Sequence, residues 1–131
     1  MPLILILDRD ARVRIALAEA FLAHGYAVLR DSRGAAGLIL ARIHLPQVVL
    51  VARDLVDMDG LTFAQRLRSV PLAVQPALVL LGMDRAPMLQ RAVDHCGVFP
   101  KPLDMAAVLT QVALVAPADV PAPLRERMVG A

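Results

Sequence analysis

Short apolar runs alternate with longer amphipathic segments along most of this chain. Runs of β-branched and aliphatic residues are typical of strands buried on both faces of a parallel sheet. They predict strands over residues 3–7, 26–29, 48–52, 77–81 and 98–99. Apolar positions at helical spacing predict helices between and after them, over residues 11–23, 34–44, 61–70, 87–95 and 104–116.

Several local signals set the expected helix ends. Asp10 is a good N-cap for the first helix, and His24-Gly25 is expected to end it, with Gly25 in the left-handed conformation. Leu45-Pro46 is expected to stop the second helix. The inner stripe of the first helix is predicted to contain Val13, Leu17, Phe21 and Leu22.

Five strands alternating with five helices predict an α/β fold with a doubly wound parallel sheet, because each crossover must be right-handed. The flavodoxin-like strand order 2-1-3-4-5 is the natural arrangement, and its first and third strands meet at the switch point. Function is then expected in the loops beyond the carboxyl ends of the strands.

The length of 131 residues suits one domain, which we place at residues 1–116, followed by a proline-rich tail or linker at 117–131. Hydrophobic residues make up 58% of the chain and aromatic residues 3%, so an aliphatic core is expected. No apolar run reaches the roughly 20 residues needed to span a bilayer. The first run is too short for a signal sequence, and we expect a cytoplasmic protein without a membrane partner.

Charge and cysteine content exclude several further classes. The net charge is +2 and the basic residues are scattered, so the sequence predicts no direct nucleic-acid contact. The single cysteine, Cys96, excludes an internal disulfide and a cysteine-cluster metal site. The three histidines lie on separate segments, and we expect neither a metal nor a cofactor.

The candidate chemistry lies at the ends of the predicted strands. Asp8, Arg9 and Asp10 follow the first strand, an acidic loop closed by Asp59-Gly60 follows the third, and Lys101-Pro102 follows the fifth. This arrangement resembles the receiver domains of response regulators (chemotaxis-regulator-like) from bacterial two-component phosphorelay signalling. The resemblance covers about residues 3–116 and implies a cis Lys101-Pro102 peptide bond.

The resemblance also shows what the chain lacks. The phosphoryl-accepting aspartate is expected seven residues before Asp59, where Ala52 stands. One of the paired acids is replaced by Arg9, and the hydroxyl residue after the fourth strand by Gly82. The aromatic switch position falls on Val98. An aspartyl phosphate requires a carboxylate nucleophile and Mg²⁺, so these changes together predict a pseudo-receiver that takes no phosphoryl group.

The remaining charged residues have more than one interpretation. Lys101 is expected to pair with Asp8, and Arg9 either with Asp8, Asp54 or Asp57, or with solvent alone. Asp57 and Asp59 are expected to be turn and cap acids. A displaced acceptor at Asp54 would require the third strand to continue through Arg53.

Two functional classes remain open. A pseudo-receiver would be no enzyme and would act through a protein partner or a homodimer on the face formed by the fourth helix, fifth strand and last helix. The last helix is apolar nearly all round, so it should be buried all round. The expected interface residues are Met88, Leu89, Met105, Val108, Leu109 and Val112. The alternative is a small haloacid-dehalogenase-like Mg²⁺-dependent phosphohydrolase, with Asp8 as nucleophile, Asp10 as acid/base and Lys101 as the required lysine.

Overall fold

The computed structural model describes residues 1–83 and 94–118. All strands of the sheet are parallel, in the order β2-β1-β3-β4-β5. This confirms the predicted sheet and strand order. The strands are β1 (Leu3–Leu7), β2 (Ala27–Asp31), β3 (Val48–Ala52), β4 (Ala77–Leu81) and β5 (Gly97–Phe99).

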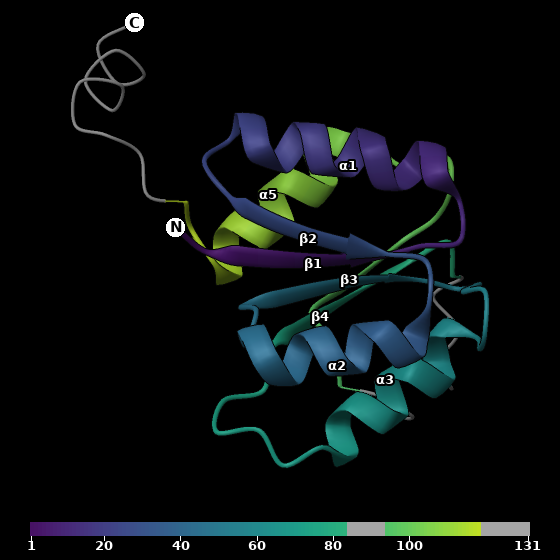
Figure 1. The fold of residues 1–131 in the computed structure, drawn as a ribbon. Helices are drawn as coiled ribbons and strands as arrows, with labels where there is room; N and C mark the ends of the chain where they lie inside the picture. The colour runs from purple at the N-terminus through teal and green to yellow at the C-terminus, as the bar shows by residue number, and fades with distance from the viewer. Residues whose placement is uncertain (84–93, 119–131) are drawn as a thin grey trace, which may run out of the picture.

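Helices cover both faces of the sheet (Figure 1). The helices α1 (Ala11–Ala23) and α5 (Met105–Val115) lie on one face, and α2 (Gly34–His44) and α3 (Gly60–Ser69) on the other. The described residues thus contain four helices, where the sequence predicted five. The missing one, over 87–95, lies outside the described residues except for Asp94 and His95, which are not helical.

The alternation of side chains along the strands divides the core into two layers. Ile4, Ile6 and Leu50 point toward α1 and α5, while Leu5, Leu7 and Val49 point toward α2 and α3. All six are completely buried. This explains why β1, β3 and β4 are apolar at every position: neither face of the sheet is left to solvent there, whereas the edge strand β2 carries Arg30 and Asp31.

The ends of the helices confirm most of the predicted signals. The Asp10 carboxylate accepts a hydrogen bond from the Arg12 backbone N–H at 2.9 Å, and Gly25 has φ +87°. Beyond α2, Leu45 itself takes the left-handed conformation at φ +49°, just before Pro46. Leu22 was wrongly placed on the inner stripe of α1, since its side chain is 58% exposed on the flank of the helix.

The last helix corrects another expectation. Val108 and Val112 are completely buried against the chain's own core, and Met105 and Leu109 pack partly on it. The opposite side is not buried, because Leu114 and Val115 are exposed. The stripe therefore docks α5 onto the sheet, so Val108 and Val112 are not available as interface residues. Met88 and Leu89 lie outside the described residues.

Tyr26 fastens the end of α5 to the start of β2. Its hydroxyl donates a buried hydrogen bond to the Ala116 carbonyl at 2.8 Å, and its ring packs edge-on against Phe21 with centroids 5.3 Å apart. Burial raises the pKa of this phenol. Within the described segments, no helix combines the length and the apolar character needed to cross a bilayer.

Candidate functional site

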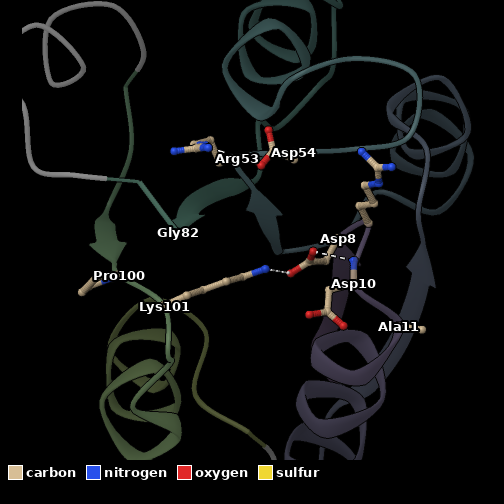
Figure 2. A pocket seen from close by; sticks show the side chains of 9 residues that line it. Asp8, Asp10, Ala11, Arg53, Asp54, Gly82, Pro100 and Lys101 are labelled. Carbon is tan, nitrogen blue, oxygen red and sulfur yellow. Dashed lines mark hydrogen bonds and ion pairs between the residues drawn. The ribbon is translucent and has the colours of Figure 1, made fainter.

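A depression of about 660 Å³ opens at the carboxyl ends of the strands, where the switch point of the sheet was expected (Figure 2). Loops after β1, β3, β4 and β5 contribute its walls. Its lining contains three acids and three cations, so it has no excess of either sign. The lining residues are Asp8, Arg9, Asp10, Ala11, Arg53, Asp54, Gly82, Pro100 and Lys101.

The centre of the site is an ion pair between Asp8 and Lys101. The Lys101 Nζ lies 2.7 Å from Asp8 Oδ2, and Asp8 Oδ1 accepts the backbone N–H of Asp10 at 2.9 Å. The Asp8 side chain is 2% exposed and that of Lys101 34%. Both carboxylate oxygens are thus engaged, which satisfies a charge that would be costly to bury alone. The predicted pairing and the cis Lys101-Pro102 bond are both confirmed.

Ala52 occupies the end of β3, beside Leu81 of β4, and is 1% exposed. The strand ends there rather than continuing through Arg53, as a displaced acceptor at Asp54 would require. The Asp54 carboxylate instead lies on the rim, 3.5 Å from Nε of Arg53, with both side chains largely exposed. The strand-end position therefore carries a methyl group and no nucleophile.

Gly82 directly follows β4 and has φ +72°, a backbone conformation that residues other than glycine rarely adopt. Its N–H donates to the Phe99 carbonyl at 2.7 Å. A Cβ built on Gly82 would lie 3.5 Å from the Cγ and Cδ atoms of Lys101. The Lys101 stem therefore passes close to Gly82, and a serine or threonine here would be strained by the positive φ as well as newly polar.

Arg9 does not form the ion pair suggested by the sequence. Its backbone N–H donates to the Asp54 carbonyl at 3.2 Å, which joins the loops after β1 and β3. Its guanidinium makes no ion pair with any residue in the described part of the chain. Of the cations that line the depression, Arg9 is therefore the one without an ion-pair partner among the described residues.

Asp57 caps a helix that is distant in sequence. Its two carboxylate oxygens accept the backbone N–H groups of Gly34 and Ala35, at 2.7 and 3.0 Å, at the start of α2. These hydrogen bonds lower the pKa of Asp57. Asp59 caps its own helix through the Thr62 N–H at 2.7 Å. Asp57 and Asp59 were predicted to be turn and cap acids, and both cap helices; the helix that Asp57 caps was not foreseen.

The donor set does not suit a metal ion. In residues 1–83 and 94–118 no group of three or more histidine, cysteine or acidic side chains is placed to hold one. Mg²⁺ requires near-octahedral oxygen ligation, whereas Asp8 is committed to Lys101 and a backbone amide, and Ala52 offers no oxygen from its side chain. The Mg²⁺ used by receiver domains therefore does not fit the residues present here.

Comparisons with known proteins identify the fold. No protein-family profile matches the chain, and no curated protein matches its sequence. Among solved structures, it is similar to a CheY-like response regulator receiver domain from Methylobacillus flagellatus (TM-score 0.78, 19% identity, 88% of this chain and 98% of that one). It is also similar to the chemotaxis response regulator CheY4 of Vibrio cholerae (0.77, 21%, 88% and 98%).

A third similar structure is the signal receiver domain of a modulated diguanylate cyclase from Desulfovibrio desulfuricans (TM-score 0.74, 22% identity, 88% of this chain and 93% of that one). At these identities the likeness establishes a common fold. The chain therefore has the flavodoxin-like architecture of receiver domains.

Sequence reasoning missed two arginines of the site. Arg53 lines the depression beside Asp54, in the loop after β3 (Figure 2). Arg14 closes the loop after β1, because its Nη1 donates to the carbonyls of Asp8 and Arg9 at 2.7 and 3.2 Å. Arg53 could have been found from its place directly after a buried strand. Nothing in the sequence distinguishes Arg14 from other helix-surface arginines.

Proposed function

We propose that this chain is a pseudo-receiver: a signalling module of the response-regulator type, in two-component-type signal transduction, that works through protein contacts and takes no phosphoryl group. The single observation that carries this proposal is Ala52 at the buried end of β3. Covalent phosphorylation requires an attacking oxygen at this point, and a methyl group supplies none.

Two further features support the proposal. Gly82 provides no hydroxyl near the site, and its positive φ disfavours residues that would. The Asp8–Lys101 pair, in contrast, is formed by the chain's own charges, with Nζ 2.7 Å from Oδ2. It links β1 to the loop after β5 and satisfies the one charged residue that the described part of the chain buries. The pair therefore has a structural role that does not depend on phosphate.

We place the partner-binding surface on the face that contains β5 and α5, for a protein partner or a second copy. Of the predicted interface residues, Met105 and Leu109 are the two that are described and retain partial exposure. We expect neither nucleic acid nor membrane as a direct partner, and no cofactor.

The phosphohydrolase alternative is less well supported. Its nucleophile would be Asp8, which is nearly inaccessible and has both oxygens engaged. Its acid/base would be Asp10, whose carboxylate caps α1. Asp104, the acid that closely follows the lysine, caps α5 through the Ala107 N–H at 3.2 Å. Each of these acids has a structural function that explains its presence.

The test is phosphorylation by acetyl phosphate with Mg²⁺, followed by intact mass. The wild type should gain no phosphoryl mass. Ala52→Asp alone should stay nearly inert, since the unpaired Arg9 is available to bind the new carboxylate. Ala52→Asp with Arg9→Asp should be phosphorylated slowly, because repulsion among neighbouring carboxylates favours metal binding.

A matched control replaces the other arginine of the depression. Ala52→Asp with Arg53→Asp carries the same charge but leaves Arg9 in place, and should remain inert. Phosphorylation of the wild type would overturn the proposal. Mg²⁺-dependent hydrolysis of p-nitrophenyl phosphate by the wild type, lost in Asp8→Asn, would instead favour the phosphohydrolase.

A further inference from the structure

The strand β2 forms one edge of the sheet and has an open side. The N–H and C=O groups of successive residues in a strand point to opposite sides. Residues 27, 29 and 31 direct these groups toward β1, since Ala27 N–H donates to the Pro2 carbonyl and Asp8 N–H donates to the Asp31 carbonyl. The N–H and C=O groups of Val28 and Arg30 therefore point away from the sheet. Because β2 pairs only with β1 in the described sheet, and no bond outside the sheet reaches Val28 or Arg30, these groups have no hydrogen-bond partner in the described segments.

One flank of α1 overhangs this open edge. Ile15 and Leu22 are 47% and 58% exposed, and both line a groove of about 440 Å³ between α1 and β2. Val28 lies in the floor of the groove. An unprotected strand edge beside exposed aliphatic side chains is a surface prone to pairing with another chain.

The groove also contains two opposite charges that do not pair with each other. Glu19 and Arg30 both line it, yet neither forms an ion pair with a described residue. A surface that presents both members of a complementary pair side by side can match itself across a two-fold axis.

From these observations we propose that the β2 edge and the α1 flank form a homodimer interface, with a second copy of this chain as the occupant. The two β2 strands run antiparallel, with Leu29 of both copies at the two-fold axis. Val28 of each copy then faces Arg30 of the other, and the pair exchanges both N–H···O bonds. The four outward backbone groups of each copy are all satisfied.

The dimensions of the two layers agree with this arrangement. Because α1 packs over both β1 and β2, its axis lies about half a strand spacing inside β2. The two-fold axis lies half a spacing outside β2. The two axes are therefore about one strand spacing, ~4.8 Å, apart. The two α1 helices are then ~10 Å apart, within the usual range for packed helices. Ile15 and Leu22 fill the space between them, and Glu19 of one copy approaches Arg30 of the other.

This interface is distinct from the partner face proposed above. The strands β2 and β5 are the two opposite edges of the sheet, so a dimer at β2 leaves the face with β5 and α5 open. The dimer proposal also does not depend on the absence of phosphorylation.

Sedimentation equilibrium of the full chain gives the first test. The wild type should dimerise, and Leu22→Lys should weaken dimerisation at least tenfold. Ile39→Lys is the matched control, because Ile39 on α2 has the same 58% exposure but lies outside the groove. It should change the dimer Kd less than twofold. A wild type that is monomeric at every concentration overturns the proposal, as does a dimer equally weakened by both changes.

A charge exchange tests the pairing across the two-fold axis. Arg30→Glu and Glu19→Arg should each be monomeric, because like charges meet at both contacts. Mixing these two variants should restore a dimer, because both contacts are then complementary. Failure of the mixture to associate, when circular dichroism shows both variants folded, contradicts the proposed contact.

Hydrogen exchange distinguishes pairing of the two β2 strands from a contact made by the helices alone and from a strand contributed by another protein. The Val28 and Arg30 amides should exchange rapidly in dilute protein and slow at least tenfold at concentrations above the dimer Kd. Protection that does not depend on concentration, or protection only after another protein is added, rules out a second copy as the occupant.

Discussion

The carboxylate of Asp57 lies 2.7 Å from the backbone nitrogen of Gly34, the first residue of α2, although 23 positions separate the two residues. The residue that precedes α2, Arg33, offers no side-chain acceptor for the helix N-terminus. The loop after β3 supplies it instead, and thereby fixes its own position against α2.

Replacing Asp57 should destabilise the fold in a pH-dependent way. The pKa of Asp57 is lowered in the folded state, so its ionised form stabilises the fold at neutral pH, and this contribution is lost as the pH falls through the folded pKa. Asp57→Asn should lower the Tm at pH 7, and the difference from wild type should shrink below about pH 4. Asp54→Asn, in the same loop but on the exposed rim, should leave the Tm nearly unchanged. Equal Tm values for wild type and Asp57→Asn at pH 7 would contradict the capping role.

Replacing one partner of the Asp8–Lys101 pair should lower the free energy of unfolding more than replacing both partners. Lys101→Met leaves the buried Asp8 carboxylate without its cation and should lower the free energy of unfolding by about 2 kcal/mol, less than for a fully buried pair because the lysine is one-third exposed. Asp8→Asn with Lys101→Met should recover part of this loss. Urea unfolding of the two single variants and the double variant measures the coupling, and strictly additive losses would show that the pair is not coupled.

The close approach of α3 to β3 makes Gly60 intolerant of a side chain. A Cβ at Gly60 would overlap the Ala52 carbonyl, a backbone group that cannot move without disturbing the end of β3. Gly60→Ala should therefore lower the free energy of unfolding by about 3 kcal/mol. Gly97→Ala is the matched control: its nearest neighbours are side-chain atoms of Phe99 and Gln111 at 3.1 and 3.3 Å, so the cost should be smaller. Chemical denaturation that ranks the two variants in reverse would contradict this packing.

Removing the Tyr26 hydroxyl should loosen the end of α5. Tyr26→Phe leaves the Ala116 carbonyl without its donor and should cost about 1 kcal/mol. Because burial raises the pKa of this phenol, its neutral form stabilises the fold below the pKa of the unfolded chain, near 10, and the contribution fades as the pH rises beyond that value. Thermal melts of both proteins at pH 7 and pH 11 should therefore show a difference that narrows at the higher pH.

The strands and the switch-point site were predictable because they depend on local patterns: buried parallel strands are apolar at every position, and the residues after them must meet at one edge. What escaped prediction depends on distances between elements. The partner of Asp57 is a helix start that only the tertiary fold brings near. Leu22 lies at the border of the α1 stripe, where periodicity does not distinguish core from flank. The Arg9 side chain is solvated, and sequence does not determine the pairing of a long exposed side chain.

The methyl group of Ala52 also bears on timing. An aspartyl phosphate is hydrolysed at a characteristic rate, so the signal of a module that carries one ends at that rate. Under the proposed function this chain carries no aspartyl phosphate whose hydrolysis could end its signal. The duration of its signal is then set by how fast the cell makes and degrades the protein and by how long each complex with a partner persists.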